Sequence, residues 1–168
     1  MKKKALIIAI IIFIIFAFDF FIFSFLSNKK VSEEPLKPEE TITLKVFFNN
    51  SNLDPEASCN KVFPVERRVL KTQAVARAAL EELFKGPTEE EKTKGFFTSI
   101  NSDVKIQSLT IENGTARVDF DEQLEFQVGG SCRVSAIRAE ITETLKQFST
   151  VREVVISING RTEDILQP

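Results

Sequence analysis

Two cysteines, Cys59 and Cys132, have the most distinctive chemistry in this chain of 168 residues. The sequence places Cys59 in a polar loop and Cys132 at the start of a predicted helix. Two cysteines outside the cytoplasm usually form a disulfide, which here would close a loop of about 72 residues. Such a bridge would stabilise the fold by about 3 to 4 kcal/mol. The alternatives are free structural thiols and a reactive thiol that the helix N-terminus activates.

A second candidate site is a glycine-rich turn before the same helix. The turn consists of Gly129, Gly130 and Ser131, and Arg133 follows two positions later. Backbone N–H groups at a helix start favour a bound anion, so we treat these residues, with Arg67, as candidate anion or ligand contacts. The alternative is that Ser131 caps the helix after a flexible loop, while Arg67 pairs with an acid or contacts a helix end.

Four acids at the end of a predicted strand, Asp119, Asp121, Glu122 and Glu125, are candidates for acid–base catalysis or calcium binding. Their spacing lacks the glycine and the alternating ligands of a calcium loop, so we expect a solvated strand end. The chain contains no His, which excludes a Ser-His pair, a Cys-His pair and an imidazole metal site. We therefore predict no catalytic residue, no metal and no cofactor.

Periodic patterns of apolar residues indicate the elements that must position these side chains. Strict alternation of apolar and polar residues predicts half-buried strands, and an apolar stripe at helical spacing predicts an amphipathic helix. The predicted strands cover residues 41–48, 62–70, 104–111, 115–120 and 153–158, and the predicted helices cover residues 73–85 and 132–148. This β-β-α-β-β-α-β order predicts an α+β two-layer sandwich, with a mixed or mainly antiparallel sheet and two helices.

Local turn signals support several of these boundaries. Thr72 can cap the first helix, and Gly86-Pro87 ends it. Residues 88–94 are charged and are compatible with a short helical turn, followed by a loop to Ser102. Asn113-Gly114 lies between two apolar runs and predicts a β-hairpin.

The first residues of the chain predict a membrane anchor that precedes the sandwich. Three lysines are followed by about 22 almost wholly apolar residues, 5–26, which as a helix would span a bilayer core of about 30 Å. The lysines favour a cytoplasmic N-terminus and a domain outside the cytoplasm. A cleaved signal peptide is the competing interpretation, but this run is longer than usual and lacks a small-residue cleavage site. Asp19 is expected near the outer interface.

Changes in composition divide the chain into an anchor at residues 1–28, a polar linker at residues 29–40 and one domain at residues 41–168. A domain of this size can bury about two thirds of its unfolded surface. It holds 16 basic and 19 acidic residues without a basic run, whereas nucleic-acid binders normally show a strong basic excess. We therefore expect no nucleic-acid partner.

Seven segments, taken in order, resemble the GerMN domain, a family named after a spore-formation and germination protein. They are Val46-Phe47-Phe48, Phe63-Pro64-Val65-Glu66-Arg67, residues 79–88 (ALEELFKGPT), residues 113–120 (NGTARVDF), Gly129-Gly130-Ser131, residues 144–148 (TLKQF) and residues 154–160 (VVISING). The resemblance implies an extracytoplasmic bacterial domain, related in fold to small α+β modules that build envelope assemblies. It implies no established catalytic residue.

The residues and the resemblance together predict a non-catalytic, single-pass membrane protein of the bacterial cell envelope. Residues 5–26 would contact the membrane, and the domain would assemble with an envelope protein or with itself, or would contact cell-wall glycan. The alternative is an extracytoplasmic enzyme such as a glycan hydrolase, which would need two carboxylates facing each other across a pocket.

Overall fold

The computed structural model describes residue 14, residues 17–18, residues 20–23 and residues 39–167. The described residues of the N-terminal segment are helical. Among all described residues, no helix combines the length and the apolar character that crossing a membrane requires. The rest of the predicted anchor, including its three lysines and Asp19, and most of the predicted linker lie outside the described residues.

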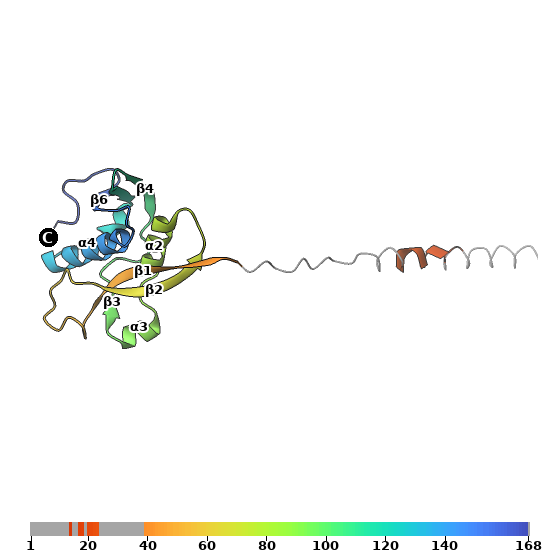
Figure 1. Cartoon of the computed structure of the whole chain (residues 1–168), viewed down its shortest axis with the longest axis horizontal. Coiled ribbons are helices and arrows are strands. Elements are labelled where there is room, and N and C mark those ends of the chain that lie inside the picture. Colours follow the sequence, from red (N-terminus) through yellow and green to blue (C-terminus); the bar gives the residue numbers. More distant parts are fainter. Residues whose placement is uncertain (1–13, 15–16, 19, 24–38, 168) are drawn as a thin grey trace, which may run out of the picture. The chain divides into compact units, whose positions relative to one another are not determined.

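Residues 39–168 form one compact unit of strands and helices (Figure 1). Its elements are β1 (Thr41–Asn50), β2 (Phe63–Leu70), α2 (Val75–Phe84), α3 (Glu89–Thr93), β3 (Phe96–Phe97), β4 (Ile106–Glu112), β5 (Thr115–Phe120), the 3₁₀ helix η1 (Glu122–Leu124), α4 (Ser131–Lys146) and β6 (Glu153–Ile158). The predicted α+β class is confirmed. The short helical turn that residues 88–94 allowed is present as α3. The structure adds β3 and η1 to the predicted order, because elements this short show little periodicity in a sequence.

The strands form two three-stranded sheets, whereas the sequence predicted one sheet. In the first sheet, β2, β1 and β3 lie side by side in that order, and both pairs are antiparallel. β1 extends two residues beyond its predicted end, because Asn49 pairs with Phe97 and Asn50 pairs with Phe96. This extension brings the end of β1 next to the cysteine-containing loop that follows it.

The second sheet has the order β4-β5-β6. β4 and β5 form the predicted hairpin, and its turn residues Asn113 and Gly114 have left-handed φ angles of 52° and 86°. β6 lies parallel to β5, and α4 belongs to the crossover that connects these two strands. The first strand of the sheet begins at Ile106, two residues later than predicted.

Side chains at the C-terminal end of α4, from Thr144 and the C-cap residue Gln147, occupy part of the β1 edge where no strand pairs. Gln147 Oε1 accepts a hydrogen bond from Lys45 N–H at 2.8 Å, and Gln147 Nε2 donates to the Lys45 carbonyl oxygen at 2.6 Å. Thr144 Oγ1 accepts a hydrogen bond from Phe47 N–H at 3.1 Å. The helix therefore completes this part of the edge in place of a strand.

The two long helices pack their apolar stripes into one core shared with both sheets. The buried apolar residues of α2 are Ala76, Ala79, Leu80 and Leu83, and those of α4 include Val134, Ile137, Ile141 and Leu145. Phe48 of β1 and Phe120 of β5 are fully buried in this core. Phe84 meets Phe120 edge-on, with the ring centroids 5.6 Å apart, so the core is continuous from helix to sheet.

The helix ends differ from the predicted caps. α2 begins after Ala74, and the hydroxyl of Thr72 accepts a hydrogen bond from Ala74 N–H at 3.1 Å without capping the helix itself. Gly130 is the N-cap of α4, so Ser131 is its first helical residue and not its cap. Gly86, with a φ of 72°, follows the end of α2 as predicted, because a left-handed residue stops a helix.

Candidate functional site

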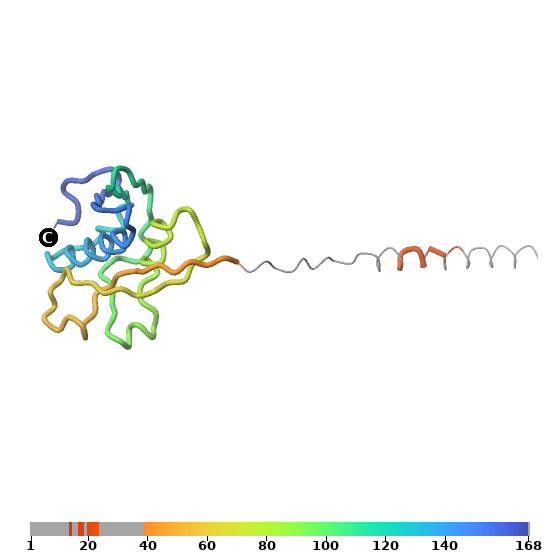
Figure 2. The backbone as a smooth tube through the Cα atoms, in the orientation of Figure 1, coloured from red at the N-terminus to blue at the C-terminus, as the bar shows by residue number. Residues whose placement is uncertain are grey.

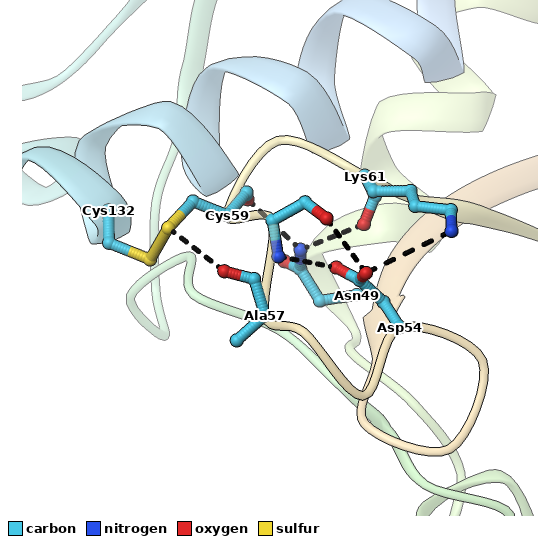
Figure 3. Close-up of a disulfide and its surroundings, with 7 residues drawn as sticks. Asn49, Asp54, Ala57, Cys59, Lys61 and Cys132 are labelled. Atoms are coloured by element: carbon cyan, nitrogen blue, oxygen red, sulfur yellow. Dashed lines mark hydrogen bonds and ion pairs between the residues drawn. A yellow bond between two sulfur atoms is a disulfide. The ribbon is translucent and has the colours of Figure 1, made fainter.

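A corner of the domain, braced by a disulfide, joins the loop between β1 and β2 to the start of α4. The loop covers residues 51–62, and Figure 2 shows it running beside the N-terminal end of α4. Cys59 Sγ is bonded to Cys132 Sγ, and the two Cα atoms lie 4.9 Å apart (Figure 3). The two cysteines that the sequence singled out therefore meet at this corner.

Two side chains hold the loop in addition to the bridge (Figure 3). Asn49 Nδ2 donates to the carbonyl oxygens of Cys59, at 3.2 Å, and Lys61, at 3.1 Å. The Asp54 carboxylate accepts hydrogen bonds from Ser58 N–H at 2.7 Å and Ser58 Oγ at 2.8 Å, and it lies 3.9 Å from Lys61 Nζ. These contacts keep Cys59 at a φ of 63°, a left-handed conformation that is strained for a residue with a side chain.

Residues 97–101, which we call the strap, run across α4 on the other side of the corner. Glu140 of α4 is fully buried, accepts a hydrogen bond from Ser99 N–H at 2.8 Å and lies 2.5 Å from Thr98 Oγ1. Burial raises the pKa of Glu140 to about 7, although the hydrogen bonds from Thr98 and Ser99 act in the opposite direction. The strap is therefore attached to the helix through a carboxyl group that titrates near neutral pH.

Arg133 fastens the strap at a second point. Its Nε donates to the Ser99 carbonyl oxygen at 3.3 Å, its Nη1 to the Gln127 carbonyl oxygen at 3.2 Å, and its Nη2 to Asn101 Oδ1 at 2.6 Å. Each nitrogen of the guanidinium thus has a partner within the domain. The structure gives this candidate anion contact a structural role.

A cavity of about 410 Å³ lies between the loop, β3, the strap and the first turns of α4. Its lining includes Asn49, Ser51, Phe97, Ser99, Ala136 and the two bridged cysteines. The Phe97 side chain is 47% exposed, so part of the ring is accessible from outside. The cavity combines apolar walls with amide and hydroxyl groups, which is the composition of many small-molecule sites.

Asn49 has an unusual hydrogen-bonding state within this cavity wall. The residue is 5% exposed, and its Nδ2 has two carbonyl partners. Its Oδ1 is buried and meets no hydrogen-bond donor among the described residues. A buried acceptor without a donor costs about 1 to 3 kcal/mol of stability.

The glycine-rich turn at residues 129–131 is exposed. A Cβ atom added to Gly129 or Gly130 would meet no described atom within 4 Å. No described side chain caps α4, so the N–H groups of its first turn keep their capacity to donate. The turn therefore retains the backbone donors of the predicted anion contact, while the guanidinium of Arg133 is directed to protein carbonyl groups.

Arg67 belongs to a different part of the domain. Its guanidinium forms a bidentate pair with Glu91, with N–O distances of 2.6 and 2.7 Å, and it also donates to the Gly86 carbonyl oxygen at 3.4 Å. The Arg67 guanidinium lowers the pKa of Glu91, whose carboxylate also accepts a hydrogen bond from Thr88 N–H. Arg67 thus fastens α3 and the turn after α2, and the structure does not bring it together with the glycine-rich turn.

The acidic residues after β5 hold turns in place. Asp119 accepts hydrogen bonds from Ser157 Oγ and Gly160 N–H, Asp121 accepts one from Lys105 N–H, and Glu125 accepts hydrogen bonds from Arg161 and Leu166 N–H. Three of the four acids are therefore bonded within the fold, while none of the four is buried, as expected for a solvated strand end. In the part of the chain that the structure describes, no group of three or more acids or cysteines is placed to hold a metal ion.

Several bonding residues were missed in the sequence, namely Asn49, Asp54 and Glu140 at the corner and the strap, and Thr144 and Gln147 at the edge of β1. Glu140 and Thr144 had a detectable signal, because they lie four residues apart and beside the stripe residues Ile137, Ile141 and Leu145. Polar residues on such a face indicate buried hydrogen bonds. Asn49 was assigned to the loop after the predicted strand and showed no such signal.

Comparisons with known proteins identify the family and agree with the fold. A family model named Germane, described as sporulation and spore germination, matches residues 45–164. The spore germination protein GerM of Bacillus subtilis (strain 168) is 28% identical over 127 residues, which cover 73% of this chain and 33% of GerM. The chain therefore spans about a third of that relative's length.

Two solved structures have a similar fold. The tandem GerMN domains of the sporulation protein GerM from Bacillus subtilis match with a TM-score of 0.56 and 23% identity, over 73% of this chain and 41% of that chain. The first GerMN domain of the same protein matches with a TM-score of 0.54 and 25% identity, over 72% of this chain and 85% of that chain. The resemblance seen in the sequence is confirmed by these matches. The chain belongs to the GerMN domain family of sporulation and spore germination proteins.

Proposed function

We propose that this chain is a non-catalytic, membrane-anchored domain that binds a component of the cell envelope outside the cytoplasm. The disulfide-braced corner would be its binding site. The observation that carries the proposal is that the corner keeps a cavity of about 410 Å³ while its ionisable side chains are bonded to the walls. A catalytic site needs reactive groups that converge on a substrate, whereas a recognition site needs a preformed shape with a few polar groups.

The wall contacts support a recognition role. Asp54 is bonded to Ser58, Arg133 to three oxygen atoms, and Glu140 to the strap. These bonds use the charged groups to fix the shape of the cavity. Ordering the walls before a ligand arrives reduces the entropy lost on binding, which favours affinity and selectivity.

The proposed location rests on the sequence of the anchor and on the cysteines. Three lysines before the apolar residues 5–26 favour a cytoplasmic N-terminus and place the domain on the opposite side of the membrane. A disulfide persists in an oxidising compartment, which fits the same location. The name of the relative GerM, a spore germination protein, favours a role in spore formation or germination.

Photocrosslinking in living cells tests the binding function on the intact anchored chain. A photoreactive amino acid at position 97, in the cavity lining, should give one discrete adduct with an envelope component. The same amino acid at exposed position 146 should not, because Lys146 lies at the far end of α4, about 21 Å along the helix from Cys132. Identical adducts from both positions, or random membrane neighbours alone, would count against the corner as a binding site.

Protease treatment of intact protoplasts tests the location. An external protease should remove the domain when it lies outside the cytoplasm, whereas a cytosolic marker protein should stay intact. Protection of the domain until the membrane is permeabilised would show that the proposed orientation is wrong.

A further inference from the structure

We propose that the bond between Cys59 and Cys132 is a reversible latch, which an external dithiol opens by thiol–disulfide exchange. Opening releases the turn at residues 54–59 from the start of α4, while the rest of the domain stays folded. The latch acts whatever the cavity binds, so it goes beyond the proposed function. It follows from the weak attachment of the loop, from its strained backbone, from the exposure of the bridge and from a difference between the two sulfurs.

The bridge ties an otherwise weakly attached loop to α4. Among the described residues, no hydrogen bond or ion pair joins residues 51–62 to this helix, and none of these loop residues is buried in the apolar core. The two ends of the loop are held by β1 and its neighbours, because Ser51 N–H donates to the Gly95 carbonyl oxygen at 3.0 Å and Asn49 Nδ2 donates to the Lys61 carbonyl oxygen at 3.1 Å. Cutting the bridge therefore frees the middle of the loop and leaves the core packing in place.

The turn that carries Cys59 has a strained backbone (Figure 3). Ala57 and Cys59 have φ angles of 52° and 63°, in the left-handed region that side chains disfavour. Residues in this region persist only where their surroundings restrain them. The Asp54 carboxylate bonds Ser58 between them, but Asp54 belongs to the same loop and does not fix the turn against α4. Once the bridge is cut, the turn relaxes and moves away from the helix.

The bridge is accessible to a thiol from outside. Cys132 is exposed and Cys59 is half-buried. The chain before Cys132 leaves the approach open, because a Cβ atom added to Gly129 or Gly130 meets no described atom within 4 Å. Strained or exposed disulfides are the ones that exchange readily with thiols while the protein stays folded. This bridge therefore differs from a buried structural disulfide.

The two sulfurs differ as leaving groups. Cys132 is the second residue of α4, where the uncapped N–H groups of the first turn stabilise a thiolate. Cys59 Sγ lies 3.4 Å from the Ala57 carbonyl oxygen, whose partial negative charge disfavours a thiolate at that place. Because the more stable thiolate leaves faster, the attacking thiolate bonds to Cys59 and expels Cys132.

The exchange balances with the dithiol as the only co-reactant. One thiolate of the dithiol forms a bond to Cys59 Sγ while the bond from Cys59 Sγ to Cys132 Sγ breaks, and Cys132 leaves as a thiolate. The second thiolate of the dithiol then attacks the dithiol sulfur in this mixed disulfide, and Cys59 leaves as a thiolate. The two cysteines take up the two protons that the dithiol released. The chain thus gains two electrons and two protons, and the dithiol is oxidised to a disulfide.

Two matched variants and a monothiol probe test the direction of attack. Ser131→Asp places a carboxylate beside Cys132 at an exposed position and should slow reduction by dithiothreitol at least about threefold, because it destabilises the leaving thiolate. Ser131→Asn has a similar shape without the charge and should be reduced at the wild-type rate. Brief treatment with 2-mercaptoethanol and then with an alkylating agent should place the mixed disulfide on Cys59 and the alkyl group on Cys132. Equal rates for the two variants, or a mixed disulfide mainly on Cys132, overturns the proposed step.

Hydrogen exchange of the full-length chain in detergent micelles tests the opening itself, with dithiothreitol as the dithiol. After reduction, the amides of Ala57 and Ser58, both bonded to Asp54, should exchange at least about tenfold faster. The Ser51 amide, bonded to Gly95, is the internal control and should not change, and the far-ultraviolet circular dichroism should also stay the same. Reoxidation should restore the slow exchange. A bridge that resists dithiothreitol without denaturant, unchanged exchange at Ala57 and Ser58, or unfolding of the whole domain overturns the latch.

Discussion

Replacing Glu140 with Gln should stabilise the domain at alkaline pH and leave its stability unchanged in acid. Glu140 is fully buried on α4, and its carboxyl group is bonded to Ser99 N–H and Thr98 Oγ1. Gln keeps both contacts, because its amide oxygen can accept from Ser99 N–H and its amide nitrogen can donate to Thr98 Oγ1, which reverses the direction of that one hydrogen bond. The substitution therefore removes the ionisation and little else.

The size of the effect follows from the pKa of this carboxyl group. Burial raises the pKa of Glu140 from 4.5 to about 7, so the folded chain keeps a proton that the unfolded chain has lost. The stabilisation is fully present below the unfolded pKa and is lost as the pH rises through the folded pKa. The shift corresponds to about 3 kcal/mol between the two limits.

Urea unfolding of the full-length chain in detergent micelles measures this difference. Far-ultraviolet circular dichroism is the suitable signal, because the chain has no Trp and no Tyr. Glu140→Gln should match the wild type at about pH 4 and exceed its free energy of unfolding by about 3 kcal/mol at about pH 8.5. Glu143→Gln, at an exposed position of the same helix, is the control and should follow the wild type. The same pH dependence in the wild type and in Glu140→Gln would refute the reasoning.

Three further measurements test the contacts described above. Natively purified protein should show no alkylatable thiol by mass spectrometry, and two alkylatable thiols would contradict the bridge. Cys59→Ala should lower the free energy of unfolding by about 3 to 4 kcal/mol. Arg67→Ala should lower the free energy of unfolding in urea by about 2 kcal/mol, because it leaves the largely buried carboxylate of Glu91 unpaired. Lys92→Ala removes an exposed ion pair and should lower it by less than about 1 kcal/mol. Equal losses from the two variants would contradict this distinction. Gln147→Ala should speed hydrogen exchange of the Lys45 amide about tenfold, and unchanged exchange would show that this side chain does not complete the β1 edge.

Elements with a single buried face were predictable from the sequence. β5 and β6 have their predicted bounds, because apolar residues recur along each strand and turn residues adjoin them, Asn113-Gly114 before β5 and Asn159-Gly160 after β6. The hairpin was predictable because Asn113 and Gly114 tolerate the left-handed backbone that its turn requires. The two cysteines were the predictable part of the candidate site, since few other residue types pair covalently.

Features that depend on contacts between distant residues were not predictable. The division into two sheets is one example, because a side chain bonds the edge of β1 where a strand of the second sheet could have paired. This side chain belongs to Gln147, which lies 102 positions from its partner Lys45. The strand β3 has two residues, too few to show a pattern. Arginine often binds ligands, so Arg67 and Arg133 were reasonable candidates. Their partners, Glu91 and Asn101, lie 24 and 32 positions away in the chain, and the sequence gives no sign of these pairs. The cavity likewise depends on the path of the loop and the strap.

The side chains of Thr144 and Gln147, which cover part of the β1 edge, also affect how readily this domain aggregates at high concentration. An open strand edge invites pairing with another molecule, and repeated pairing builds aggregates. On this edge the N–H and the carbonyl oxygen of Lys45 bond Gln147, and the N–H of Phe47 bonds Thr144. A second molecule would have to displace a folded helix to pair there, so crowding alone does not start polymerisation along this edge.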